Sequence, residues 1–363
     1  MRLARKIYQR YLVRETLAAV GLVLLAFIAL FAFFDFIEEL RGVGRDRYGA
    51  GVAVLAVLLS MPGLIYELLP VACLIGTLYA LATLARHSEI TVLRASGLST
   101  RSLLLTLYRV AGLLALATFL LGEVVVPWTD RLEQRLKSGA LDKPFAQQGF
   151  MSGVWIKDGN QFINVRNPLD PAYLEDVRIY RFAEDKALQS VLEAKAASYS
   201  EAASGWRMQQ VVRTVLEGES ARVERQEEEL WPSSITPDLL SVLMVAPERM
   251  SLYDLFGYTR HLSNNKQNTG RYEIAIWKKL FYPLAALVMV TLALPFGYTH
   301  DRVGGVSLKI FGGVMLGIAF YALNGLFSNL GIINSWPPFA SALAPSALFL
   351  LAAGTLIWWV ERR

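Results

Sequence analysis

Several residue patterns on which enzyme activity depends are missing from this 363-residue chain. Its single cysteine, Cys73, excludes an intramolecular disulfide and a cysteine-rich metal site. The three histidines, His87, His261 and His300, are far apart and lack the spacing of metal ligands. The phosphate-binding pattern G-x-x-x-x-G-K-[ST] and the nucleophile pattern G-x-S-x-G are also absent. The sequence therefore predicts a chain with no catalytic centre, metal ion or bound nucleotide of its own.

Charge is missing from long stretches. Residues 310–360 contain no charged side chain, and 54% of the chain is hydrophobic, which is typical of a polytopic membrane protein. We expect membrane spans at about 16–36, 102–126, 277–298, 306–330 and 339–360. Segment 48–85 has one charge, Glu67, and is too long for a single crossing. We expect an interfacial helix before Pro62 and one crossing near 64–84, with a re-entrant or double crossing as the alternative.

Basic residues then orient the six predicted spans. Five lie within the first 14 residues, and Arg86, Arg94 and Arg101 lie between the second and third spans. Because cytoplasmic loops carry an excess of Lys and Arg, both termini are predicted to be cytoplasmic. The long insert between the third and fourth spans is then extracytoplasmic.

The insert alternates apolar and polar residues with period two. Residues 154–165 flank Asp158-Gly159, which is typical of a hairpin, and further strands are predicted at 177–182, 188–200, 206–217 and 221–231. The pattern indicates an all-β meander, sandwich or open jelly roll. Ser251 is expected to cap a helix at about 252–263.

Cationic residues flank the predicted outer ends of the spans. They are Arg41, Arg45, Arg47, Arg131, Arg135, Lys137, Lys278 and Lys279. One interpretation is that these long side chains only extend their charged ends to the membrane–water interface. The other is a basic rim for an anionic amphiphile, because the arginine fork binds phosphate through two contacts.

The charged stretch RHSEITVLRASG (86–97) is predicted to form a short cytoplasmic helix. Ser88 is a candidate N-cap and Gly97 a candidate C′ residue. Glu89 either stabilises the positive end of the helix dipole or offers a carboxylate to a basic cleft on a partner. The residues alone leave both interpretations open.

Longer motifs carry a resemblance to a known family. They are LARHSEITVLRASG (84–97), GEVVVP (122–127), WIKDGNQF (155–162), SITPDLL (234–240), GRYEIAIWKKLFYPL (270–284) and WPPFASALAPSALF (336–349). With these motifs the chain resembles, over essentially its whole length, the LptF/LptG permease family, the inner-membrane subunits of the lipopolysaccharide-export ABC transporter. WIKDGN and GRYEIAIWKK look more like the LptG branch than the LptF branch.

The resemblance implies an α-helical polytopic fold of six transmembrane helices, three plus three, with an inserted all-β jellyroll-like periplasmic domain. The implied regions are 1–127 with a coupling helix at 86–97, 128–270 with the β-domain and a linker helix, and 271–363. Implied partners are a cytoplasmic ATPase homodimer that binds ATP and Mg, a second homologous permease, a single-span periplasmic bridge protein and lipopolysaccharide, but no nucleic acid. Such a subunit lies in the bacterial inner membrane and binds no cofactor itself.

The resemblance also implies site residues. Those implied to engage the ATPase are Arg86, Ser88, Glu89 and Arg94. Those implied to contact lipopolysaccharide phosphates are Arg41, Arg45, Arg131, Arg135, Lys137 and Lys279. Spans 1 and 5 are implied to line a lateral portal through Phe27, Phe31, Phe34, Phe320, Leu323 and Phe327. Asp35 departs from relatives that carry Lys. Alternatives are the paralogous LptF-type subunit and a membrane-anchored assembly or binding protein that transports nothing.

Overall fold

The computed structural model describes residues 2–44, 47–97, 99–141, 153–170, 172–183, 185–201, 203, 205–217, 220–233, 235–237, 239–240, 247–298 and 306–362. The chain divides into two compact units. The first comprises Met1–Arg41, Val57–Asp130 and Gly270–Arg363, and the second comprises Gly42–Ala56 and Arg131–Thr269. Each unit has its own apolar core.

Six helical stretches of the described chain are long and apolar enough to cross a membrane: Ile7–Leu40, Ala50–Arg86, Arg101–Lys137, Gly270–Phe296, Ser307–Ile333 and Pro338–Trp359. The helices that form them are α1 (Arg2–Leu40), α2 (Ala50–Arg86), α4 (Thr100–Leu120), the π-helical turn η1 (Leu121–Val125), α5 (Val126–Leu141), α8 (Gly270–Phe281), the 3-10 turn η4 (Tyr282–Leu284), α9 (Ala285–Tyr298), α10 (Val306–Ile333) and α11 (Pro338–Glu361). The predicted arrangement of three spans before the insert and three after it is confirmed.

Helix α2 differs from its prediction. Pro62 and Pro70 both lie inside one uninterrupted helix of 37 residues. Such a helix is about 55 Å long and exceeds a hydrocarbon core of about 30 Å. Proline is tolerated in membrane helices because neighbouring groups compensate for the lost backbone hydrogen bond. The expected break before Pro62 is therefore wrong, and the double crossing is excluded because it needs a turn within 61–70.

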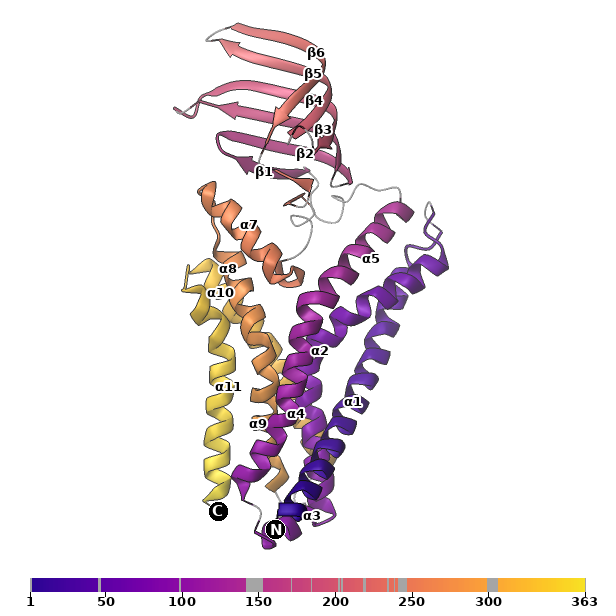
Figure 1. Ribbon diagram of the computed structural model, residues 1–363, viewed down its shortest axis with the longest axis vertical. Helices are drawn as coiled ribbons and strands as arrows, with labels where there is room; N and C mark the ends of the chain where they lie inside the picture. The colour runs from indigo at the N-terminus through magenta and orange to yellow at the C-terminus, as the bar shows by residue number, and fades with distance from the viewer. Residues whose placement is uncertain are drawn as a thin grey trace. The chain divides into compact units, whose positions relative to one another are not determined.

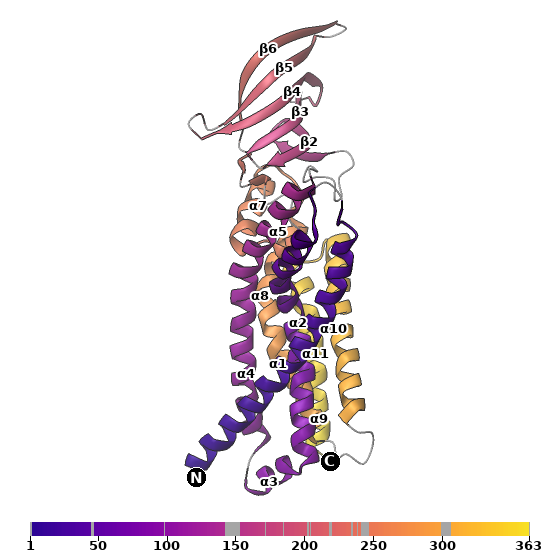
Figure 2. The ribbon, with the colours of Figure 1, turned by 90° about the vertical axis from the view of Figure 1, so that its right-hand side faces the viewer.

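Close helix approaches hold α2 against both α1 and α10. Gly76 of α2 faces the backbone of Val20 in α1, and a Cβ at Gly76 would lie 2.5 Å from the Val20 Cα. Gly313 of α10 leaves space for the side chain of Leu78 in α2. Around these helices, α4 packs against α1 and α9, and α11 packs against α8, α9 and α10 (Figure 2).

The second unit is built on one antiparallel sheet. Its strands are β1 (Val154–Asp158), β2 (Gln161–Asp170), β3 (Tyr173–Phe182), β4 (Leu188–Ser200), β5 (Gly205–Glu217) and β6 (Ser220–Pro232). Each strand pairs with its neighbours in sequence, in the order β1-β2-β3-β4-β5-β6 (Figure 1). The predicted strands are confirmed, and the described strands form the simplest of the predicted topologies, a meander. The hairpin at 154–165 is also confirmed, with Gly159 and Asn160 as its turn residues.

One face of the sheet forms the core of the second unit. Ile156, Ile163, Ile179 and Leu192 face one another across four consecutive strands, and all four are buried. The Trp206 indole N–H, also buried, donates a hydrogen bond to the Ile235 carbonyl at 2.7 Å.

Helix α7 (Leu252–Asn264) follows the strands in the chain and belongs to the second unit. The predicted cap is confirmed, because Ser251 Oγ accepts a hydrogen bond from the Asp254 backbone N–H at 3.1 Å. At the other end of the helix, Asn265 Oδ1 accepts a hydrogen bond from the Gly159 N–H at 2.7 Å. The second of these bonds links the end of α7 to the turn of the β1–β2 hairpin.

Candidate functional site

A short helix, α3 (Glu89–Ala95), joins α2 to α4 within the first unit. Ser88 precedes it with φ of 60°, in the left-handed region that few non-glycine residues adopt, and its carbonyl accepts a hydrogen bond from the Val92 N–H at 3.0 Å. Gly97 follows with φ of 94°, as predicted for a C′ residue. Left-handed residues therefore bound α3 at both ends and separate it from its neighbours.

Helix α3 has a buried side and an outward side. Ile90 is 6% exposed and belongs to the same apolar cluster as Leu12 and Leu107, whereas Val92 is 66% exposed. Arg86 and Ser88 are exposed, and Glu89 is partly exposed. The side chain of Arg94 lies outside the described residues. The helix thus presents polar and apolar atoms outward while one side chain anchors it to the core.

Polar contacts link the amino-terminal end of α1 to α3 and α4. The Tyr11 hydroxyl donates to Glu89 Oε1 at 3.4 Å. The hydroxyls of Tyr8 and Ser102 lie 2.8 Å apart, and Arg109 donates to Gln9 Oε1 at 3.0 Å. This end of α1 is therefore in contact with the segment that contains Glu89, a link that the sequence alone did not reveal.

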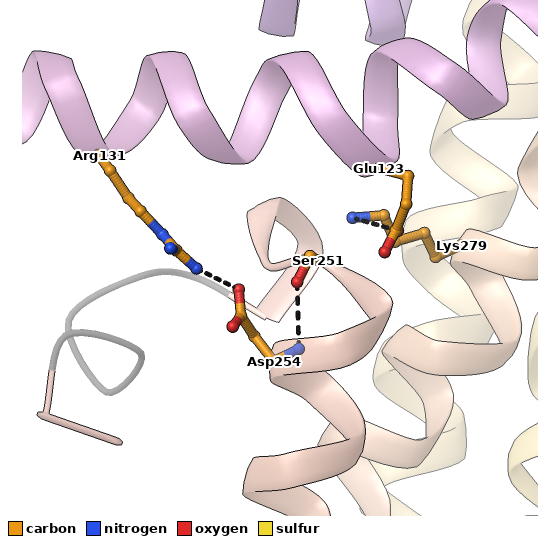
Figure 3. Close-up of polar contacts among 5 residues, drawn as sticks. All are labelled: Glu123, Arg131, Ser251, Asp254 and Lys279. Carbon is orange, nitrogen blue, oxygen red and sulfur yellow. Dashed lines mark hydrogen bonds and ion pairs between the residues drawn. The ribbon is translucent and has the colours of Figure 1, made fainter. Parts of the chain in front are cut away.

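In the second unit, two predicted phosphate-binding cations already have acidic partners. Arg131 Nη2 lies 2.5 Å from Asp254 Oδ2, so that α5 is joined to the first turn of α7 (Figure 3). Lys137 Nζ lies 2.7 Å from Glu133 Oε1, one turn earlier on α5. Arg135, on the same helix, is exposed. An arriving anion at Arg131 or Lys137 would meet a cation already paired with a carboxylate.

In the first unit, Lys279 is 6% exposed and its Nζ lies 3.6 Å from Glu123 Oε2 (Figure 3). Glu123 belongs to the π-helical turn η1. π-Helical turns inside α-helices are rare and occur often at functional sites. Breaking a buried ion pair by removing one partner is strongly destabilising, so Lys279 and Glu123 help to hold α8 against the α4–η1 segment.

The remaining predicted cations differ in what surrounds them. Arg41 is exposed at the end of the first unit's opening segment. Arg45 lies outside the described residues. Asp35 accepts a long hydrogen bond of 3.5 Å from Ser60 Oγ on α2. Asp35 therefore has a structural contact that links α1 to α2.

The predicted portal residues fall into two groups. Phe31 and Phe34 on α1 are exposed and Phe27 is partly exposed. On α10, Leu323 and Phe327 are partly buried, whereas Phe320 is 4% exposed and packs edge-on against Phe349 at 5.1 Å. The exposed apolar side chains of α10 are different ones: Leu308, Phe311, Met315, Ile318, Tyr321, Leu326, Ile332 and Ile333. The 3.6-residue period of a helix could have distinguished the buried face of α10 from its exposed face in the sequence.

No group of three or more His, Cys, Asp or Glu side chains that could hold a metal ion occurs in the ranges given above.

Comparison with known proteins agrees with the sequence motifs. The family model "Lipopolysaccharide export system permease LptF/LptG" matches residues 10–359. The permease protein LptG of Haemophilus influenzae strain Rd is 30% identical over 354 residues, which is 98% of each chain. LptG of Escherichia coli K12 is 30% identical over 358 residues, again 98% of each. LptF of Escherichia coli K12 is 31% identical over 169 residues, which is 46% of this chain and 44% of the relative.

Proposed function

The chain belongs to the LptF/LptG family of lipopolysaccharide export permeases, and we propose that it acts as the LptG-type membrane subunit of the ABC transporter that extracts lipopolysaccharide from the inner membrane. Matches over 98% of the chain to LptG relatives, against 46% to an LptF relative, support this branch of the family. ATP and Mg bind to a separate ATPase, because this chain contains no nucleotide-binding motif.

The observation that carries the proposal is helix α3, a separate helix of seven residues with Glu89 at its start. Helix α3 is short, and the buried side chain of Ile90 anchors it to the core. Val92 is exposed, so this side of the helix is available for contact with a partner protein. Arg86, Ser88, Glu89 and Arg94 would contact a cytoplasmic ATPase homodimer. A second homologous permease completes the transporter, and both chain termini lie in the cytoplasm.

Lipopolysaccharide would bind between this subunit and its partner permease. The exposed phenylalanines of α1 and the exposed apolar side chains of α10 would contact acyl chains, and Arg41, Arg45, Arg131, Arg135, Lys137 and Lys279 would attract phosphates. A phosphate at Lys279 would compete with the carboxylate of Glu123. When the ATPase closes, it moves α3 and narrows the space between the two permease subunits. The lipid then leaves toward the periplasmic β-domain and a single-span bridge protein. This chain supplies different lipid affinities in two states, and ATP supplies the work.

The test uses the whole transporter, reconstituted in vesicles with lipopolysaccharide. Glu89→Gln removes the charge but keeps the shape of the side chain. Loss of one partner of an interfacial charge pair costs about 2–5 kcal/mol, so ATP-driven lipid release should fall at least tenfold. Glu15→Gln, an exposed carboxylate on α1, is the matched control and should release lipid normally. Normal release by Glu89→Gln would refute the coupling role.

A further inference from the structure

The ion pair between Arg131 and Asp254 connects two helices that are far apart in sequence. The arginine side chain is 48% exposed, whereas that of Asp254 is 13% exposed. Only Nη2 of the guanidinium makes the contact with Asp254, and a guanidinium has five N–H donors. Arg131 is therefore accessible to an anion from solvent while it is paired.

Asp254 is held in place independently of Arg131. Its backbone N–H donates to the Ser251 cap, so its carboxylate lies in the first turn of α7, where the helix dipole favours negative charge (Figure 3). An anion that takes Arg131 from Asp254 must therefore compete with a carboxylate that is already positioned. It also leaves behind a largely buried negative charge.

We propose that Asp254 is a specificity-determining residue, a built-in competitor that restricts Arg131 to lipids carrying phosphate monoesters. The proposal rests on the proposed role of Arg131 in binding lipid phosphate. A phosphodiester headgroup carries one negative charge, as the Asp254 carboxylate does. A phosphate monoester carries about 1.5 to 2 negative charges near pH 7 and has three acceptor oxygens.

Competition of this kind discriminates by charge. A singly charged phosphodiester gains little by replacing a carboxylate of equal charge that is already in contact. A monoester gains more from the guanidinium, because charge-assisted and bidentate contacts strengthen with the charge of the acceptor. Phospholipids that carry phosphodiesters would otherwise occupy the same cation. When the monoester leaves, Asp254 takes Arg131 again, so the cation returns to its paired state.

The experiment measures which lipid occupies the intact transporter. The complex is placed in nanodiscs with a lipid carrying two phosphate monoesters, such as lipid A, in competition with phosphatidylglycerol, and bound lipid is quantified after purification. The variants are Asp254→Asn, Arg131→Gln and their combination. Glu248→Gln removes one exposed negative charge six residues away and is the matched control.

Asp254→Asn should raise phosphatidylglycerol occupancy and lower the preference for the monoester lipid about two- to fivefold, the range expected for a partly exposed ion pair. Glu248→Gln should leave the preference unchanged. The effect of Asp254→Asn should vanish in the Arg131→Gln background, because the competition acts through that guanidinium.

The outcomes separate the two proposals. If Arg131→Gln weakens monoester binding while Asp254→Asn leaves the preference unchanged, Asp254 has no competing role and the basic rim stands. An effect of Asp254→Asn that persists without Arg131 would also overturn the inference, because it would then act through α7 itself. If Arg131→Gln leaves monoester binding unaltered, the assignment of Arg131 to the rim fails as well.

Discussion

Replacing Gly76 by alanine should loosen the contact between α1 and α2. The added Cβ would lie 2.5 Å from the Val20 Cα, 2.6 Å from its nitrogen and 2.8 Å from its Cγ2. Two of these three atoms are backbone, so a change of rotamer cannot relieve the overlap. Ordinary contact begins near 3.5 Å, and α1 must therefore retreat by about 1 Å.

The size of the effect follows from two opposing contributions. Alanine is favoured over glycine by about 1 kcal/mol inside a helix. Overpacking a well-filled interior costs about 1–3 kcal/mol, and Val20 is only 2% exposed. The overlap involves backbone, which places the cost at the upper end of that range. We therefore expect a net loss of about 1–2 kcal/mol, equivalent to a melting temperature lower by several degrees.

The sole cysteine provides the assay. Cys73 is fully buried on α2, so a thiol-reactive dye that fluoresces on coupling reports the unfolding of the first unit during heating in detergent. Gly112→Ala on α4 is the matched control, because a Cβ there meets nothing within 4 Å and the helix should be stabilised slightly. Unfolding of Gly76→Ala at or above the wild-type temperature, with Gly112→Ala behaving as expected, would refute this account of the contact.

Three further predictions concern charged groups and hydroxyls. Lys279→Met should lower the melting temperature of the first unit, because it removes the buried cation beside Glu123, and losing one partner of a buried ion pair costs about 3–5 kcal/mol. Glu123→Leu in the same chain should restore much of the lost stability. Tyr11→Phe should reduce the stimulation of ATP hydrolysis by lipid while ATPase assembly, measured by co-purification, stays normal, because only the hydroxyl contact with Glu89 is lost. Burial lowers the pKa of His261 below 6.5, against the opposing charge of Asp158. The unfolded chain then binds more protons, so the second unit should lose stability as the pH falls through about 6.5, and hydrogen exchange should lose this pH dependence in His261→Gln.

Much of the fold could be predicted from local sequence patterns. Charge-free runs predict spans, period-two alternation predicts strands, and local chemistry predicts the Ser251 cap and the left-handed Gly97. The prediction at Pro62 was wrong, because it applied a rule for soluble helices, in which proline ends or breaks the helix. In a membrane helix, neighbouring groups compensate for the lost hydrogen bond, and the helix continues.

The partners of the site residues could not be predicted. Asp254 lies 123 positions from Arg131, and Glu89 lies 78 positions from Tyr11, so no periodicity links them. Sequence reasoning found the cations and the coupling segment by their chemistry. It could not assign the carboxylates that oppose the cations, because ion pairs between distant segments depend on tertiary packing.

The neighbour-to-neighbour order of the sheet has a consequence for biogenesis. Every described strand pairs with one that is synthesised just before or after it, so the hairpins can close one after another while the chain is being synthesised. The sheet need not wait for α8 to leave the ribosome. Among the strands that the structure describes, β6 lies at the edge of the sheet. Glu227 and Glu228 are exposed on β6, and such charges discourage another nascent chain from adding to that edge.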